Sequence, residues 1–134
     1  MLTGSQTKRK KMKRNSEIFS KAKQMDWEDL GAGVSRKIMG WDDKIMMVKV
    51  KFEKGAVGSP HQHMHSQTSY CAKGKFDFTV GNKKQVVEYG DGVYIPPNVI
   101  HGAVCLEAGD LIDVFSPERE DFLNGKGTSY SGDR

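Results

Sequence analysis

The four histidines of the chain lie in two short stretches, which makes them the first candidates for chemistry. They are His61, His63 and His65 in one stretch and His101 in the other. In an extended chain, side chains two residues apart point to the same face about 7 Å apart, so the rings of His61 and His63 can converge on one ion. Imidazole nitrogens bind metals such as zinc at about 2.0–2.1 Å. The spacing predicts a metal site with His61 and His63, and His101 is the distant histidine that can complete it.

The chain around these histidines has the period-two pattern of β-strands. Met46, Val48, Val50 and Phe52 alternate with mostly polar neighbours, which is typical of a strand with one buried face. The same reasoning predicts strands over residues 34–39, 46–52, 68–72, 76–80, 85–89, 93–95, 102–106 and 111–115. Turn-forming residues separate them at short intervals, among them Gly55, Gly58-Ser59-Pro60, Gly74, Gly81-Asn82, Gly90-Asp91-Gly92 and Gly109-Asp110. Short strands at this spacing predict an all-β sandwich or barrel.

Two segments at the ends of the strand-rich region have helical features. Residues 15–30 are expected to be helical or irregular. Four apolar residues recur there at roughly helical spacing: Ile18, Phe19, Ala22 and Met25. After the last strand, Ser116 is suited to cap a helix and Pro117 to be its first residue. The sequence therefore predicts a short N-terminal helical segment and a C-terminal helical turn.

Basic residues are concentrated in the first 14 residues. This stretch has no acidic residue and contains six of the 21 lysines and arginines: Lys8, Arg9, Lys10, Lys11, Lys13 and Arg14. The rest of the chain has 15 basic and 17 acidic residues, so the positive net charge of +4 comes from the first 14 residues. A protein that binds nucleic acid carries its basic charge on the folded surface, so we expect no nucleic-acid partner. Residues 1–14 are expected to be a disordered basic leader; the alternative is a segment that binds an anionic partner.

Length and composition set further limits on the kind of protein. A chain of 134 residues fits one domain. No apolar run approaches the about 20 residues of a membrane helix, and the start lacks the apolar stretch of a secretory signal. We therefore expect a cytoplasmic protein with no membrane partner. Cys71 and Cys105 are too few for the disulfide framework of a small secreted domain, and we expect both to be reduced.

The residues around the histidines resemble the two sequence motifs of the cupin superfamily. The first motif places a glycine, a His-x-His pair, a glutamate and a second glycine at fixed spacings. The chain matches every spacing of this motif with Gly55, His61, His63, Gln67 and Gly74. The resemblance implies a single cupin domain, a double-stranded β-helix or jelly-roll barrel, over residues 15–123. Residues 124–134, which are small and polar, are expected to form a flexible tail.

The second cupin motif is matched by Gly90, Pro96, Asn98 and His101. Asn98 stands where the motif has a turn glycine, a mild change because asparagine tolerates left-handed backbone geometry. The resemblance implies that His61, His63, Gln67 and His101 bind one divalent transition metal ion. Zinc, nickel, manganese and iron all stay open as its identity.

Gln67 stands where the first motif has a glutamate ligand, which changes the chemistry of the site. An amide offers one neutral oxygen to the metal, so the full charge of the ion would be kept and its Lewis acidity raised. The alternative is that Gln67 is no ligand and that water takes its place. His65 continues the histidine alternation, but a regular strand would carry it too far from His61 to bind the same ion. It is expected to support a ligand, to contact the substrate or to lie at the rim.

The segment after the second motif contains residues that suit an acidic sugar. Asp113 and Phe115 share one face of the last predicted strand, and Arg119 follows shortly after. A guanidinium can bind a carboxylate with two hydrogen bonds, an aromatic ring can pack on a sugar face, and a carboxylate can move protons. The alternatives are a surface acid near a turn for Asp113 and a salt bridge within a helix for Arg119.

This segment and the His-x-His-x-His-x-Gln stretch are similar to the pectin-degradation (KdgF-like) cupins. That resemblance implies an enzyme that opens the ring of 4,5-unsaturated uronates released by polysaccharide lyases. It implies His61, His63, Gln67 and His101 as metal ligands. It implies Asp113, Phe115 and Arg119 as the catalytic residues.

Two other functions stay open, because the cupin fold carries many activities. One is an Fe(II)-dependent dioxygenase, since three-histidine iron sites occur among cupins. The other is a non-catalytic cupin that binds a metal or a sugar. The partner implied by the preferred function is a small acidic sugar, and by analogy with other small cupins we expect a homodimer.

Overall fold

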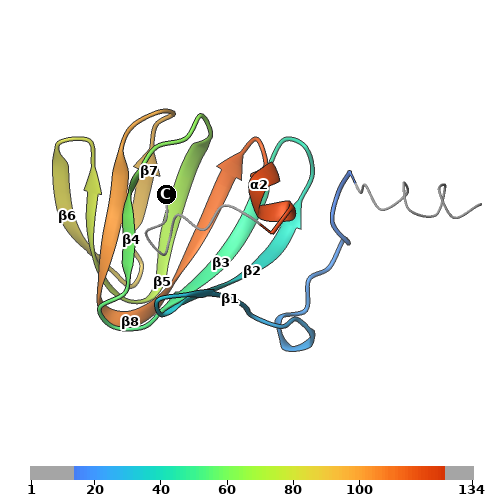
Figure 1. Cartoon of the computed structure of the whole chain (residues 1–134), viewed down its shortest axis with the longest axis horizontal. Coiled ribbons are helices and arrows are strands. Elements are labelled where there is room, and N and C mark those ends of the chain that lie inside the picture. Colours follow the sequence, from blue (N-terminus) through green and yellow to red (C-terminus); the bar gives the residue numbers. More distant parts are fainter. Residues whose placement is uncertain (1–13, 126–134) are drawn as a thin grey trace, which may run out of the picture.

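The computed structural model describes residues 14–125, which are drawn in colour in Figure 1. Nearly the whole of the predicted basic leader and most of the predicted flexible tail, residues 1–13 and 126–134, lie outside the described residues. Strands dominate the described chain. They are β1 (Glu28–Gly31), β2 (Val34–Trp41), β3 (Met46–Phe52), β4 (Val57–His61), β5 (Ser66–Val80), β6 (Lys83–Glu88), β7 (Gly92–Ile95) and β8 (His101–Ser116). The helical elements of this part are the 3-10 turn η1 (Ala22–Gln24) and the short helix α2 (Glu120–Leu123), and neither is long and apolar enough to cross a membrane.

The strands form one antiparallel sheet that is curved into a barrel. The order is β1-β2-β3-β8-β5-β6, with β4 added beside β8 and β7 added beside β5. The two longest strands, β5 and β8, pair along their whole length and change their outer neighbours on the way. β8 first pairs with β4 and then with β3, while β5 first pairs with β7 and then with β6. Figure 1 shows both long strands bending at the lower end of the barrel. The predicted all-β jelly-roll architecture is confirmed.

Two glycines permit this bend. Gly74 of β5 has φ of +86°, and a Cβ there would lie 2.6 Å from the carbonyl oxygens of Ala108 and Glu107. Gly109 of β8 faces it, and a Cβ on Gly109 would lie 2.0 Å from the carbonyl oxygen of Lys73. The two backbones therefore approach more closely than any side chain allows. The sequence predicted a turn at each of these glycines and two short strands in place of each long one. That prediction was wrong, because the glycines mark irregularities within continuous strands.

The core lies between the two halves of the barrel and follows the predicted alternation. In β3, Met46, Val48, Val50 and Phe52 are buried while Met47 and Lys51 are exposed. Other strands contribute Val34, Cys71, Phe76, Phe78, Val87, Ile95, Cys105, Leu111 and Phe115 to the same cluster. Both cysteines are free thiols, as expected, and burial raises the pKa of each.

The N-terminal segment is largely irregular before β1, one of the two forms expected for residues 15–30. Only η1 is helical between residues 15 and 30, and Ile18 and Phe19 are 87% and 80% exposed. The segment instead runs beside β2. The amide of Ser16 donates to the carbonyl oxygen of Trp41 at 2.9 Å, and Nζ of Lys37 donates to that of Ala22 at 2.8 Å. Because these backbone groups find partners on β2, the weak helical pattern is overridden.

Two further local predictions were wrong. Gly58-Ser59-Pro60 was expected to be a turn but lies within β4, an edge strand in which the missing amide of proline is tolerated. Ser116 was expected to cap the last helix, yet it ends β8 and donates its hydroxyl to the carbonyl oxygen of Lys44 at 2.7 Å. The helical turn exists, but its N-cap is Arg119.

Candidate metal centre

Strand pairing brings two distant histidines together. β4 ends at His61, β8 begins at His101, and these two residues are direct partners in the antiparallel register. Their ring centroids are 4.3 Å apart. The two histidines are 40 positions apart in the chain, and strand pairing places their imidazole rings side by side.

His63 completes the cluster from the loop between β4 and β5. The amide of Asn98 donates to the carbonyl oxygen of His63 at 2.7 Å, which joins this loop to the turn before β8. Asn98 has φ of +61°, the left-handed geometry for which the motif uses glycine. The ring centroid of His63 lies 5.6 Å from that of His61 and 4.8 Å from that of His101. His63 follows the end of β4 at His61, so its ring is placed by the loop and not by the strand.

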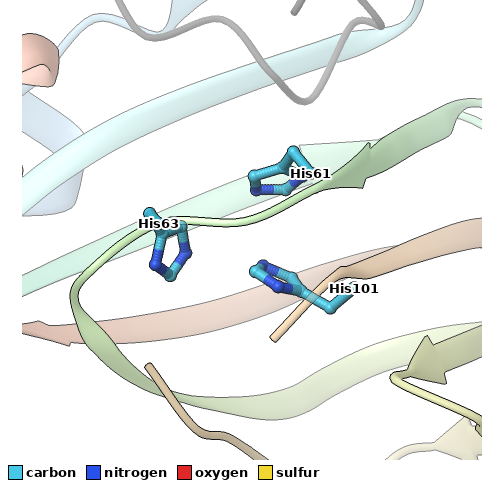
Figure 2. Close-up of side chains that lie close together, drawn as sticks. All are labelled: His61, His63 and His101. Carbon is cyan, nitrogen blue, oxygen red and sulfur yellow. The ribbon is translucent and has the colours of Figure 1, made fainter. Parts of the chain in front are cut away.

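The three rings can offer their nitrogens to one ion. Figure 2 shows them turned toward a common point from β4, the loop and β8. One ligand atom of each histidine lies within 4.8 Å of the others. Imidazole nitrogens around one ion at about 2.0–2.1 Å are about 3–4 Å apart, so small adjustments suffice for all three to bind. His61, His63 and His101 are therefore positioned to bind a metal ion.

Backbone carbonyl groups fix the orientation of all three rings. Nδ1 of His61 donates to the carbonyl oxygen of Ser59 at 2.8 Å, and Nδ1 of His101 donates to that of Val99 at 3.0 Å. Nδ1 of His63 lies 3.2 Å from the carbonyl oxygen of His65. A carbonyl oxygen only accepts, so Nδ1 of His61 and Nδ1 of His101 carry the proton and the Nε2 atom of each ring offers a lone pair. This is the usual outer arrangement of metal-binding histidines.

The polar atoms inside the cluster fit a cation. Nε2 of His101 is buried without a hydrogen-bond partner. Nε2 of His63 lies 2.9 Å from Oε1 of Gln67, so both nitrogens of His63 face acceptor oxygens. A neutral imidazole has one N–H and cannot satisfy both. Two metal ligands at right angles are about 3 Å apart, so a cation at this point would relieve the contact between the lone pairs of His63 and Gln67.

Burial keeps the rings of His63 and His101 neutral at neutral pH. Burial and, second, the nearby charge of Arg119 together lower the pKa of His63 to about 4, against the opposing effect of its contact with Gln67. Burial also lowers the pKa of His101 to about 4, with smaller contributions from the neighbouring histidines. Since metals bind unprotonated imidazole, both ligands are in the binding form at neutral pH.

Gln67 is linked to Asp113 through Ser69, a residue that sequence analysis missed. Nε2 of Gln67 donates to Oγ of Ser69 at 3.0 Å, and Oγ of Ser69 donates to Oδ1 of Asp113 at 2.7 Å. Ser69 and Asp113 are direct partners in the pairing of β5 with β8. All three side chains are buried. Ser69 shares the inward parity of Gln67 and Cys71 on β5, which was the available signal for its position.

The residues predicted to act on the substrate lie at the same end of the barrel. His61, Gln67, His101, Asp113 and Arg119 line one cavity together with apolar residues of the core. The cavity is small, about 30 Å³, and it is partly open to solvent. Asp113 is only 1% exposed, which rules out the surface acid considered above.

Arg119 is both a cavity residue and a member of a local ion pair. Its Nε and Nη2 donate to Oδ1 and Oδ2 of Asp121 at 3.1 and 2.8 Å, and its guanidinium carbon lies 4.2 Å from the ring centre of Phe122. Burial raises the pKa of Asp121, but the hydrogen bond and charge of Arg119 outweigh this and leave it lowered overall. A guanidinium has five N–H groups, so the three that do not face Asp121 stay available at its outer end.

Phe115 and His65 support the site from its side. The Phe115 ring is 1% exposed and packs against His63 at 5.8 Å and Phe122 at 5.6 Å between centroids, so little of its face is open to a sugar. Nε2 of His65 lies 3.1 Å from the carbonyl oxygen of Glu118, next to Arg119. His65 therefore connects the histidine loop with the segment that carries Arg119, and it stands outside the three-histidine cluster.

Comparison with known proteins agrees with this barrel and site. The cupin domain family model matches residues 48–115, which include the histidine cluster, Gln67 and Asp113 but not Arg119. The chain is 48% identical to the pectin degradation protein KdgF of Dickeya dadantii, covering 72% of this chain and 90% of the relative.

Solved structures give the same result. An RmlC-like cupin from Shewanella frigidimarina superposes with a TM-score of 0.81 at 46% identity, covering 82% of this chain and 99% of that one. KdgF from a Halomonas species superposes with a TM-score of 0.77 at 40% identity, covering 81% and 100%. The chain belongs to the cupin superfamily and, within it, to the family of the KdgF pectin-degradation proteins.

Proposed function

We propose that this protein opens the ring of 4,5-unsaturated uronates to give linear 4-deoxy-5-keto uronates during the breakdown of pectin- or alginate-type polysaccharides. One observation carries the proposal: Asp113 and Arg119 line the same cavity as His61, Gln67 and His101. An acid/base group, a carboxylate-binding group and a metal centre are thus available to one small ligand. The family name of the relatives, pectin degradation, agrees with a uronate substrate.

Arg119 is suited to bind the substrate carboxylate. The contact with Asp121 occupies one edge of the guanidinium, so a carboxylate would be bound by the outer pair of Nη1 and Nη2. The ring of Phe122 and the carboxylate of Asp121 fix the plane of the guanidinium before the substrate arrives. Such preorganisation reduces the entropy lost on binding.

Asp113 is suited to move the proton that the reaction requires. The substrate is a cyclic enol ether with a hemiacetal. Opening breaks the bond between the ring oxygen and the anomeric carbon, the hemiacetal hydroxyl becomes a carbonyl group, and the ring oxygen becomes an enol. The enol then loses its O–H proton while the neighbouring carbon gains one. The reaction is an isomerisation without a redox partner, and Asp113 would accept and return the proton.

His61, His63, His101 and Oε1 of Gln67 are the residues that would bind a divalent metal ion at this site. When bound, such an ion supplies Lewis-acid polarisation of substrate oxygens. Phe115 would act by packing beneath His63 and Arg119, since its ring is 1% exposed. The homodimer predicted above stays a prediction, which light scattering of the purified chain would check.

The test is to follow the ultraviolet absorbance of the conjugated double bond after adding the protein to unsaturated galacturonate freshly released by a lyase. We expect the absorbance to fall faster than in the uncatalysed control. The rate should drop strongly in Asp113→Asn and in Arg119→Ala. No acceleration by the metal-loaded protein would contradict the proposal, and so would full turnover in both variants. Oxygen uptake with Fe(II) would then test the dioxygenase alternative.

A further inference from the structure

Ser69 lies between the metal centre and Asp113, and its hydrogen bonds have a defined direction. The residue is 3% exposed on the inner face of β5. Its Oγ lies 3.0 Å from Nε2 of Gln67 and 2.7 Å from Oδ1 of Asp113. A hydroxyl has one proton to donate, and Ser69 donates it to Oδ1 of Asp113. The Ser69 proton therefore points to Asp113, and the Ser69 oxygen accepts a hydrogen bond from its other neighbour, Gln67.

This direction determines which end of the Gln67 amide faces the histidines. Because Oγ of Ser69 must accept, its partner is the NH₂ group of Gln67 and not the amide oxygen. The amide oxygen then points the other way, where it lies 2.9 Å from Nε2 of His63. With the amide reversed, two oxygens would face each other at Ser69 and an N–H donor would point into the metal centre. A metal ion needs the oxygen, because a neutral amide nitrogen has no lone pair to offer it.

We propose that Ser69 is a positioning residue that keeps Oε1 of Gln67 directed at the metal and ties this ligand to Asp113. The inference rests on the proposed role of Gln67 as a ligand. It also explains how a neutral amide can serve as a ligand at this position. A carboxylate presents an oxygen to the metal in either orientation of its end group. Glutamine presents its oxygen in only one of two orientations, so a neighbouring residue must fix that orientation. Ser69 can only accept from Gln67 because its own proton is donated to Asp113, its partner in the pairing of β5 with β8.

The experiment compares metal binding by the full-length protein and by the variant Ser69→Ala, after removal of metal with a chelator. Zinc affinity is measured by competition with a chromophoric chelator, and the visible spectrum of the Co(II)-loaded protein reports the coordination. We expect Ser69→Ala to bind zinc about 10–100-fold more weakly, the usual effect of losing a partner of a metal ligand. We also expect its Co(II) spectrum to change, because the Gln67 oxygen is no longer held on the ion.

Two further variants separate positioning from packing. Ser69→Thr keeps the hydroxyl and should restore both the affinity and the spectrum. Cys71→Ala is the matched control, because Cys71 is the next inward residue on β5, is fully buried and bonds to the backbone near the bend rather than to the metal centre. It should bind zinc as the natural protein does. If Ser69→Ala is too unstable to purify, Ser69→Val replaces it, since valine has the shape of the Ser69→Thr variant without its hydroxyl.

The variant Gln67→Ala distinguishes failure of this inference from failure of the proposed ligand set. Weaker binding in both Gln67→Ala and Ser69→Ala, with the changed Co(II) spectrum, supports the positioning role. Weaker binding in Gln67→Ala with unchanged affinity and spectrum in Ser69→Ala overturns the role of Ser69 alone. Unchanged affinity in both variants overturns Gln67 as a ligand and the inference with it. An effect of Cys71→Ala equal to that of Ser69→Ala would also overturn it, because packing would then explain the loss.

Discussion

The histidine centre and the Arg119 segment stand at the same end of the barrel but are positioned by different kinds of contact. His61 and His101 are placed by the pairing of β4 with β8, and their rings are oriented by backbone carbonyl oxygens. Arg119 follows the last strand and is placed by the side chains of Asp121 and Phe122. The three-histidine cluster therefore depends on the backbone, and the proposed substrate-binding segment depends on side chains. Mutations should separate the two.

Removing a histidine of the cluster should have the largest effect. We expect His101→Ala to weaken zinc binding by more than the about 10–100-fold that follows loss of an outer partner. The reason is that Nε2 of His101 is buried and has no hydrogen-bond partner among residues 14–125. Calorimetry on the chelator-treated protein measures this change. His65→Gln is the matched control, because His65 lies outside the cluster and should keep the affinity. An equal loss in both variants would mean that the cluster is not the site.

The next largest effect should appear in turnover without loss of the metal. We expect Asp113→Asn to reduce the rate of uronate ring opening by about 10²–10⁴-fold, the usual contribution of a general acid or base. Zinc binding should fall by no more than in Ser69→Ala, because the asparagine oxygen can still accept the Ser69 hydrogen bond although the amide no longer imposes its direction. Steady-state kinetics and zinc titration on the same preparation check both points. Full turnover in this variant would remove Asp113 from the mechanism.

Asp121→Asn should act on the Arg119 segment alone. The neutral amide forms weaker hydrogen bonds with the guanidinium than the carboxylate does, and Arg119 loses its fixed orientation. We expect the KM for the uronate to rise about tenfold, or about 1.4 kcal/mol, with little change in kcat or zinc affinity. Asp43→Asn is the control, because Asp43 is an exposed acid near Lys44 on the surface. A fall in zinc affinity with unchanged KM would show that the two regions are not separable.

The smallest effect should be an acid sensitivity of the metal-free protein. The pKa of His63 and of His101 is about 4 in the folded chain against 6.5 ordinarily, so the unfolded chain binds protons between these values that the folded chain does not. Stability should therefore be constant above pH 6.5 and fall as the pH decreases toward 4. We expect Tm to decrease across this window, measured by thermal denaturation with chelator present. His101→Gln should show a flatter profile, and an equal slope in that variant would contradict the assignment.

The sequence predicted the metal part of the site better than its surroundings. The spacing of His61, His63 and His101 identified the three-histidine cluster, even though Gly58-Ser59-Pro60 within β4 was expected to be a turn. The reason is that motif spacing depends on the backbone path, which similar sequences share. Strands were recognised where one face is buried, as in β3, because alternation directly reflects burial.

The parts that escaped prediction depend on contacts between distant segments. Gly74 and Gly109 resembled turn residues, and only their mutual approach shows that they belong to two continuous strands. The apolar spacing of Ile18 and Phe19 resembled a helix, but hydrogen bonds to β2 decide the local structure. Ser69 could not be predicted, because a single serine in a strand has no distinctive sequence pattern. Its role follows only from its position between Gln67 and Asp113 in the fold.

The most direct test of the central claim is anomalous diffraction from crystals of the protein loaded with zinc. The account predicts one strong peak between His61, His63 and His101, within bonding distance of the three Nε2 atoms and of Oε1 of Gln67. No peak at this point, or a peak coordinated by other residues, would contradict it.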